Sequence, residues 1–241
     1  MNLLLLEPAD IITAAEVDCG RAIVRGRRLT HVQNVHQAVV GDTLRIGMVN
    51  GEMGEATIER LEQHELELSY RLGIQPPAPL PITVLLALPR PKMLKRTFQT
   101  LAAMGVKRIV LMNTYRVEKS YWQTPWLQPE AIREQLLLGL EQARDTVLPE
   151  VILEKRFKPF VEDRLSAMGV GMRKLVAHPV SEQECPRRLV EPVMLAIGPE
   201  GGFIPYEVER LLEYGFECVH LGSRILRVET AVPVLLSRLS P

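Results

Sequence analysis

Two glycine-bearing loops near the C-terminal end hold the residues best suited to ligand chemistry. Residues 198–203 read Gly-Pro-Glu-Gly-Gly-Phe, and residues 222–230 read Gly-Ser-Arg-Ile-Leu-Arg-Val-Glu-Thr. Glycine lets the backbone approach a bound molecule closely because it carries no side chain. A cation such as Arg227 can stabilise a developing negative charge, and a carboxylate such as Glu200 or Glu229 can accept a proton. The sequence therefore predicts a ligand site built from both loops.

Each loop follows a short apolar run, residues 193–197 for the first and 218–221 for the second. Apolar runs that stop at glycine are typical of buried strands that end in tight turns. Between the loops, residues 205–214 have helical spacing and end at Gly215, a typical residue just past a helix end. In open α/β sheets, ligands bind at the carboxyl ends of such strands.

The two motifs resemble the C-terminal signature of the SPOUT-class RNA methyltransferases, in particular the ribosomal RNA small subunit methyltransferase E family, which methylates N3 of a uridine in 16S ribosomal RNA. That family carries Gly-Pro-Glu-Gly-Gly-Phe and then Leu-Gly-x-Arg-Ile-Leu-Arg-x-Glu-Thr-Ala. Residues 198–203 and 221–231 match these motifs, with Val228 where threonine is usual. The resemblance implies S-adenosylmethionine as the cofactor, a trefoil-knotted SPOUT-type parallel sheet, a homodimer, and the ribosomal RNA or the small ribosomal subunit as the partner.

The matched loops imply a cofactor pocket of backbone groups and apolar walls, formed by Ile197, Gly198, Gly201, Gly202, Leu221, Gly222, Ile225 and Leu226. Uridine N3 is a weak acid that must lose its proton before it attacks a methyl group. Arg227 is therefore the candidate stabiliser of the uridinate, with Glu200 and Glu229 as bases. For both carboxylates, bracing of the loop through backbone N–H groups is the favoured interpretation. The reaction requires no metal, and the five histidines show no ligand spacing beyond His31 and His36, which are not four residues apart.

Net charge is zero, which alone argues against nucleic acid, but the charges are unevenly distributed. Between residues 90 and 119 there are eight basic residues and one acidic residue, and four arginines precede residue 29 with no acid between residues 19 and 40. Phosphate neutralisation is one use of such patches, and a solvated surface is the alternative. The predicted RNA-binding residues are Arg21, Arg25, Arg27, Arg28, Lys92, Lys95, Arg96, Arg116 and Arg224.

The chain divides near residue 75, where residues 73–81 hold four prolines and predict a stiff linker. Residues 1–72 show a first strand at the N-terminus, alternating strands at 21–25, 42–46, 55–59 and 65–69, and a helical turn at 31–36. We therefore expect a small β-barrel, and the family resemblance implies a PUA-like RNA-binding domain.

Residues 82–241 alternate apolar runs with helical patterns. Strands are predicted at 82–88, 108–112, 150–153 and 174–178, and helices at 92–104, 131–143 and 161–168. This alternation predicts an α/β domain with a mostly parallel sheet. Residues 131–140 and 232–239 are more apolar than isolated surface helices require, which favours a homodimer. If Thr230 caps the last helix, Pro233 falls in its first turn, where it is tolerated.

The remaining composition excludes several classes. No stretch approaches eighteen apolar residues, and the leucine-rich start meets Glu7 and Pro8 too soon for a signal peptide. The three cysteines are far apart in sequence, which argues against a disulfide framework and suits a reducing cytoplasm.

On the substrate side the chain departs from the family pattern. Val35-His36-Gln37 stands where Val-Leu-Arg is usual, residues 100–106 differ from the usual Lys-Ala-Thr-Glu-Leu-Gly-Val, and Asp145 replaces an arginine. Two alternatives therefore stay open beside the uridine-N3 methyltransferase. One is a methyltransferase for another RNA base or position, and the other is a non-catalytic RNA-binding factor of ribosome assembly.

Overall fold

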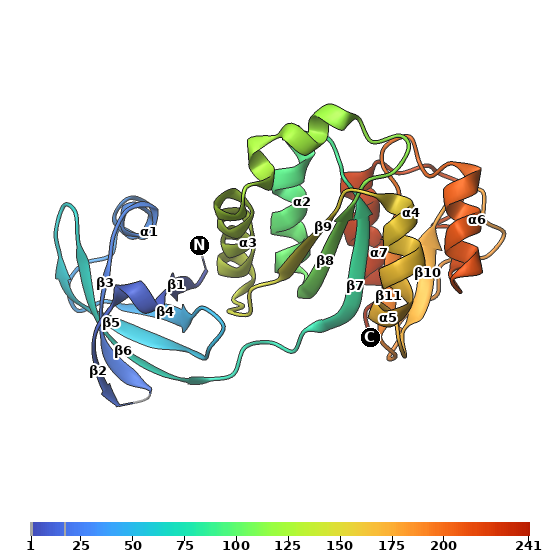
Figure 1. Cartoon of the computed structure of the whole chain (residues 1–241). Coiled ribbons are helices and arrows are strands. Elements are labelled where there is room, and N and C mark those ends of the chain that lie inside the picture. The colour runs from blue at the N-terminus through green and yellow to red at the C-terminus, as the bar shows by residue number, and fades with distance from the viewer. Residues whose placement is uncertain (1, 17) are drawn as a thin grey trace. The chain divides into compact units, whose positions relative to one another are not determined.

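The computed structural model describes residues 2–16 and 18–241 and divides into two compact units (Figure 1). The first unit comprises the residues up to Ala78 together with Leu137–Leu148. The second comprises Pro79–Leu136 and Pro149–Pro241. The segment Leu137–Leu148 thus belongs with the N-terminal unit, although it lies inside the stretch that the sequence assigns to the second domain. The domain roles given to 1–72, 73–81 and 82–241 stay predictions.

The first unit contains one sheet in the described residues, with the strand order β1-β4-β5-β6-β3-β2. Its strands are β1 (Leu4–Leu6), β2 (Ile11–Glu16), β3 (Cys19–Val24), β4 (Thr43–Met48), β5 (Met53–Leu61) and β6 (Leu66–Ile74). Strand β1 pairs parallel with β4, and the other neighbours pair antiparallel. A short helix, α1 (Arg27–His31), continues into a π-helical segment at Val32–His36.

Alternation explains how this sheet is buried on one face. In β6 the side chains of Leu66, Leu68 and Tyr70 are buried, while the residues between them are partly exposed. The same pattern in β3 buries Ala22 and Val24 against them in one apolar core. The alternating strands and the helical turn are confirmed, whereas β2 carries no alternation and was not predicted. The PUA-like identity of this unit stays a prediction.

The second unit contains one fully parallel sheet in the described residues, with the order β12-β10-β11-β7-β8-β9. The strands are β7 (Leu80–Ala87), β8 (Val106–Met112), β9 (Glu150–Glu154), β10 (Arg173–Ala177), β11 (Val193–Ile197) and β12 (Glu217–Val219). The central strands are continuous apolar runs because helices cover both faces of the sheet. The predicted parallel α/β sheet is confirmed, and the trefoil knot stays a prediction.

The covering helices lie in two layers (Figure 1). Helix α6 (Pro205–Glu213) and the helical segment formed by α4 (Phe157–Pro159), Phe160–Leu165 and α5 (Ser166–Met168) pack on one face with Leu85, Val110 and Met194. Helices α2 (Pro91–Ala103) and α7 (Val228–Leu239) lie on the other face, in contact with each other. Helix α3 (Pro129–Ala143) follows two short 3-10 turns, Lys119–Gln123 and Pro125–Leu127.

The start of α7 differs from the expectation. The helix begins at Val228, and its N-cap is Arg227. Thr230 therefore lies inside the first turn of the helix and is not the cap. Pro233 therefore lies inside the helix rather than in its first turn. At that position proline has no N–H to donate to the carbonyl oxygen four residues earlier.

Candidate functional site

A cavity of about 260 Å³ opens where the strands β10, β11 and β12 end. Parallel neighbours end at the same edge of a sheet, so the loops that follow these strands meet there. All of the predicted cofactor residues line this cavity, together with Glu200 and Arg224: Ile197, Gly198, Gly201, Gly202, Leu221, Gly222, Ile225 and Leu226. The structure thus brings together two loops that the sequence separates.

The first loop is a tight turn that needs its glycines. The Gly202 N–H donates to the Pro199 carbonyl oxygen at 2.7 Å, and Gly202 has φ = +74°. A Cβ on Gly198 would stand 3.0 Å from the backbone nitrogen of Phe203. A side chain at Gly202 would strain the left-handed backbone, and a Cβ at Gly198 would press on the backbone of Phe203, which would have to shift slightly. The loop therefore presents bare backbone to the cavity.

The second loop leaves backbone polar groups free. The Gly222 N–H donates to His220 Nδ1 at 2.9 Å, with φ = +116° at Gly222. Over the described ranges, the backbone groups of Leu221, Ile225 and Leu226 form no hydrogen bond within the protein. These N–H and C=O groups are available to a ligand that offers complementary donors and acceptors, such as the edge of a purine ring.

Two further elements line the cavity that the sequence did not assign to it. Strand β10 contributes Ala177, His178 and Pro179 at its end, and α7 contributes Val228 and Leu235. Burial lowers the pKa of His178 below its usual value, so this imidazole is neutral at pH 7. The sequence places His178 at the end of a predicted strand near the expected site, where a structural role was the favoured interpretation. The sequence did not predict that Val228 and Leu235 line the cavity, because it placed the start of the last helix after Thr230 and not at Val228.

Contacts from neighbouring strand ends hold the first loop in place. Glu200 Oε1 accepts a hydrogen bond from the backbone N–H of Arg90 at 3.1 Å, just before α2. Arg116, in the loop after β8, donates from its guanidinium to the carbonyl oxygen of Gly201. A Cβ on Gly201 would stand 2.9 Å from Arg116 Cδ. Glu200 therefore makes the bracing contact with a backbone N–H that the sequence analysis favoured, and a catalytic role for it stays a prediction.

The three predicted catalytic residues are not gathered at one point. Glu200 lines the cavity, and Arg227 is exposed and stands between the lining residues Leu226 and Val228. Glu229 instead lines a second groove of about 220 Å³ between α2 and α7, with Arg96, Thr97 and other residues of α2. Glu200 and Arg227 are both exposed and neither makes an ion pair in the described residues, so Arg227 is the unpaired cation among the three.

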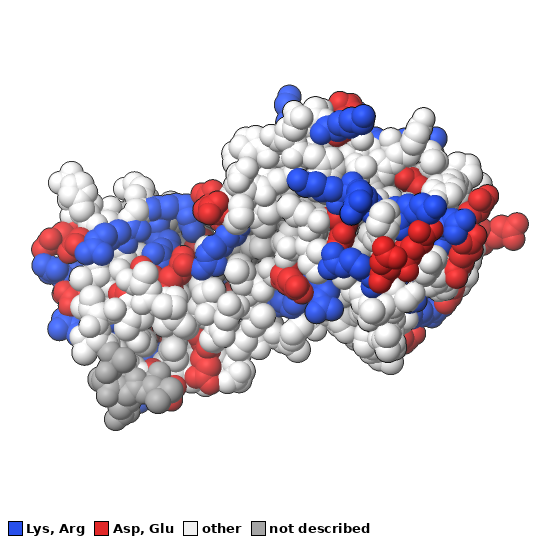
Figure 2. Space-filling view, in the orientation of Figure 1, with Lys and Arg blue, Asp and Glu red and all other residues white. Residues whose placement is uncertain are grey.

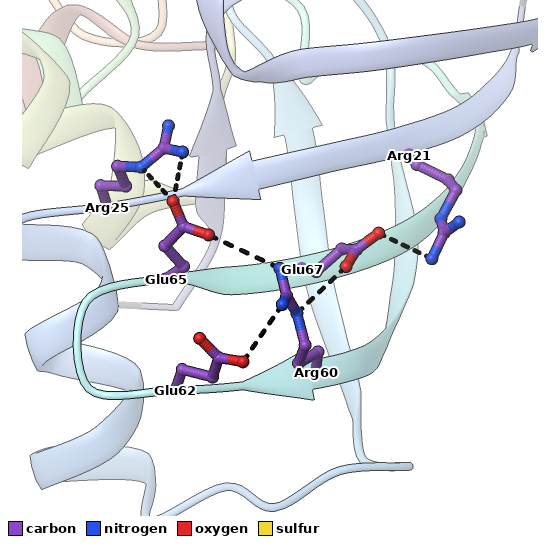
Figure 3. Close-up of polar contacts among 6 residues, drawn as sticks. All are labelled: Arg21, Arg25, Arg60, Glu62, Glu65 and Glu67. Atoms are coloured by element: carbon purple, nitrogen blue, oxygen red, sulfur yellow. Dashed lines mark hydrogen bonds and ion pairs between the residues drawn. The ribbon is translucent and has the colours of Figure 1, made fainter.

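The predicted RNA-binding arginines of the first unit are all paired with carboxylates. Arg21 meets Glu67 at 2.6 Å and Arg25 meets Glu65, while Arg60 lies among the neighbouring glutamates (Figure 3). The two others form bidentate pairs, Arg27 with Glu141 at 2.8 Å and Arg28 with Asp10 at 2.6 and 2.8 Å.

Figure 2 shows the consequence for the visible face of the first unit, where basic and acidic atoms are interspersed. The local excess of arginine in the sequence therefore does not produce an unneutralised basic surface around these four residues. Their role in RNA binding stays a prediction.

The predicted RNA-binding cations of the second unit are less neutralised. Lys92 and Arg96 are exposed on α2, and in the described residues neither makes an ion pair. Arg224 is exposed at the cavity and also makes none. Lys95 lies over the ring of Trp126, with Nζ 4.1 Å from the centroid. The free positive charge near the cavity is thus carried by α2 and the second loop.

Comparison with known proteins places the chain in a family. A family model described as RNA methyltransferase domain matches residues 76–240. A ribosomal RNA small subunit methyltransferase E from Treponema pallidum is 28% identical over 238 residues, which cover 96% of this chain and 87% of that protein. A protein of the same name from Synechocystis is 25% identical, with 88% of this chain and 70% of that protein covered.

A solved structure has the same fold. It is the ribosomal RNA small subunit methyltransferase E from Neisseria gonorrhoeae bound to S-adenosyl methionine, with a TM-score of 0.75 and 20% identity. The alignment covers 98% of this chain and 95% of that chain. In the described part of the chain, no helix is long and apolar enough to cross a membrane. The family resemblance seen in the sequence is confirmed.

Proposed function

The chain belongs to the RNA methyltransferase domain family, and we propose that it transfers a methyl group from S-adenosylmethionine to N3 of a uridine in 16S ribosomal RNA. The observation that carries the proposal is the cavity formed by the two glycine loops at the edge of the parallel sheet. The names of the relatives from Treponema pallidum and Synechocystis support ribosomal RNA of the small subunit as the substrate.

The cavity fits the proposed cofactor in size and chemistry. Its volume of about 260 Å³ lies just below the range of small-molecule sites, about 300–1,000 Å³. Ile197, Leu226 and Leu235 provide apolar walls for an adenine ring, and the free backbone groups of the second loop can bind its polar edge. S-adenosylmethionine supplies an electrophilic methyl group on a sulfonium, for which no metal is needed.

Arg227 is the residue we assign to the uridine. Its guanidinium is exposed beside the cavity and makes no ion pair in the described residues, so it can offset the negative charge that N3 acquires on deprotonation. Glu200 is held by the Arg90 N–H, and Glu229 lies in the groove against α2. We assign these two carboxylates a bracing role first, and Glu200 is the stronger candidate base because it lines the cavity.

The wider assembly follows from the family. We propose that the first unit is a PUA-like RNA-binding barrel, that residues after β11 form a trefoil knot, and that the protein acts as a homodimer in the cytoplasm, where ribosomal RNA is found. Support comes from the matched motifs and from the fold shared with the Neisseria gonorrhoeae protein. Light scattering that finds a monomer of about 27 kDa would contradict the dimer.

A second candidate function is methylation of another base or position in RNA. The substrate-side departures favour it. Asp145, which replaces the arginine of the family pattern, is buried and accepts the Val147 N–H at 2.9 Å, so it serves the first unit itself. A non-catalytic assembly factor is less favoured, because it would not need an intact cofactor cavity.

Mass spectrometry of small-subunit ribosomal RNA from a strain that lacks the gene tests the substrate. Loss of one N3-methyluridine, restored by the wild-type gene and not by an Arg227→Ala variant, is the expected result. Loss of a different mark selects the second candidate, and an unchanged RNA contradicts both. Calorimetry with S-adenosylhomocysteine tests the cofactor separately, and the absence of binding heat at high protein concentration would remove the cofactor assignment.

A further inference from the structure

Tyr115 is an unusually exposed aromatic side chain in the loop that follows β8. Its side chain is 79% exposed. Among the aromatic residues Phe, Trp and Tyr in residues 2–16 and 18–241, Tyr206 is the other exposed one, at 41%, and it has the Arg210 guanidinium 5.5 Å from its ring centroid. A tyrosine ring that is this exposed leaves its face accessible for stacking against a ligand.

The backbone around Tyr115 is fixed by a buried carboxylate. Glu207, in the first turn of α6, is 3% exposed. Its Oε1 accepts the Tyr115 N–H at 2.7 Å, and its Oε2 accepts the Ile204 N–H at 3.0 Å. A buried carboxylate with both oxygens bound holds its partners firmly, because leaving that charge unpaired is costly. Tyr115 thus stands on a rigid support despite its exposure.

The same loop is joined to the cofactor cavity and to the neighbouring strand. Arg116 donates to the carbonyl oxygen of Gly201, which lines the cavity. On the other side, the Asn113 N–H donates to the Glu154 carbonyl oxygen at 2.8 Å, and Asn113 Oδ1 accepts from Trp122 Nε1 at 2.8 Å. The backbone of Tyr115 is therefore held next to the loop that carries the proposed methyl donor, and its ring extends from there into solvent.

An exposed aromatic ring on a unit that also carries unpaired cations is suited to single-stranded RNA. Bases stack on such rings, and the interaction tolerates any base because every base has a π-face. Lys92 and Arg96 on α2 and Arg224 at the cavity supply the positive charge that holds the RNA backbone. A protein partner would match the apolar ring but would gain less from these cations.

We propose that Tyr115 is a stacking platform for a base of the RNA substrate next to the methylated nucleotide, and that Glu207 is the positioning residue that holds it. The inference rests on the proposed function, since it takes RNA as the substrate and the cavity as the cofactor site. It adds a contact that the two glycine loops do not provide. The stacked base fixes the approach of the target base to the cavity.

The first experiment measures binding of labelled small-subunit ribosomal RNA by filter retention, at a salt concentration high enough to weaken phosphate contacts. Tyr115→Ala should weaken binding about tenfold, and Tyr115→Phe should stay within about twofold of the wild type, because the ring face carries the interaction. Tyr206→Ala is the matched control, an exposed tyrosine of the same unit, and should bind as the wild type does.

The affinity for S-adenosylhomocysteine and the melting temperature should be unchanged in Tyr115→Ala. Wild-type affinity of this variant for RNA would overturn the proposal, as would an equal loss in Tyr115→Phe, which would assign the effect to the hydroxyl group. None of these binding and stability measurements requires that the protein transfer a methyl group. A wild-type protein that binds RNA through Tyr115 but leaves every uridine unmethylated would contradict the proposed function alone.

The second experiment tests Glu207 by a double-mutant cycle. Glu207→Gln should weaken RNA binding in the wild-type background and have little further effect in the Tyr115→Ala background, because its contribution to RNA affinity passes through the ring. A general structural role would instead reduce affinity by the same factor in both backgrounds. Equal effects in the two backgrounds would contradict the positioning role of Glu207.

Discussion

Gly222 and Gly41 differ in location but share one backbone property. Both have positive φ, +116° and +93°, and both have open space where a Cβ would stand. Gly222 lines the cavity, whereas Gly41 belongs to the first unit. Alanine at either position therefore introduces backbone strain of about 1 kcal/mol without a steric clash. Comparison of the two alanine variants therefore distinguishes an effect of backbone strain on ligand binding from an effect on the stability of the fold.

We expect Gly222→Ala to weaken binding of S-adenosylhomocysteine about fivefold. In the variant, the second loop relaxes away from the strained backbone conformation, and the ligand must restore that conformation when it binds. Gly41→Ala should lower the melting temperature to a similar extent and leave that affinity unchanged. Isothermal titration and thermal unfolding measure the two quantities. Equal affinities in both variants would show that the second loop does not need its present conformation to bind the cofactor.

Cys185 is a buried thiol that we expect to affect stability at high pH. It is 1% exposed, and burial raises its pKa to about 11. A raised pKa favours the folded form while the thiol is protonated, and this contribution is lost as the pH rises from about 9 to 11. In urea unfolding, the wild type should lose up to about 1.4 kcal/mol per pH unit more than Cys185→Ala over that interval. Parallel losses would contradict this expectation.

At the scale of elements, continuous apolar runs were the most reliable signal. Strands β7 and β11 were predicted within two residues because their side chains are buried on both faces and leave no competing pattern. Strand β2 was missed because its sequence, Ile-Ile-Thr-Ala-Ala-Glu, has neither such a run nor clear alternation. The start of α7 was misplaced because its N-cap, Arg227, makes no side-chain capping bond that a sequence pattern could reveal.

Pro233 inside α7 gives a prediction at this scale. Proline in a helix interior removes one backbone hydrogen bond, so Pro233→Ala should restore it and raise the free energy of unfolding by about 2 kcal/mol. Pro205 is the control, since it occupies the first turn of α6, where no N–H is needed. Pro205→Ala should change stability by less than about 1 kcal/mol. Urea unfolding measures both, and a destabilised Pro233→Ala variant would show that the proline ring has a packing role.

At the scale of the whole molecule, local charge was a poor guide to free charge. The arginines near residue 25 form a basic cluster in the sequence, but their partners come from distant segments. Glu141 is 114 positions from Arg27 in the sequence. Glu67 lies on β6 and pairs with Arg21 on the neighbouring strand β3. Local spacing cannot reveal such pairs, because only the fold brings them together. The same holds for Glu207, whose carboxylate reaches Tyr115 at a separation of 92 positions.

The salt dependence of RNA binding tests which cations meet the phosphates. Each phosphate contact contributes a slope of about −0.9 for a duplex, or about −0.7 for a single strand, in a plot of log affinity against log salt. Lys92→Gln with Arg96→Gln removes two unpaired cations of α2 and should flatten the slope by roughly 1.4 to 1.8 units. Arg21→Gln with Arg25→Gln removes two cations of the first unit that already pair with Glu67 and Glu65.

The second double variant should flatten the slope less, because an arginine that meets a phosphate must first give up its carboxylate, and the net gain is small. Filter binding over a range of salt concentrations measures both variants against the wild type. An equal change in the two would show that the first-unit arginines exchange their glutamates for RNA and take part in RNA binding, as the sequence predicted. An unchanged slope in the α2 variant would contradict the assignment of the free cations of the second unit to RNA.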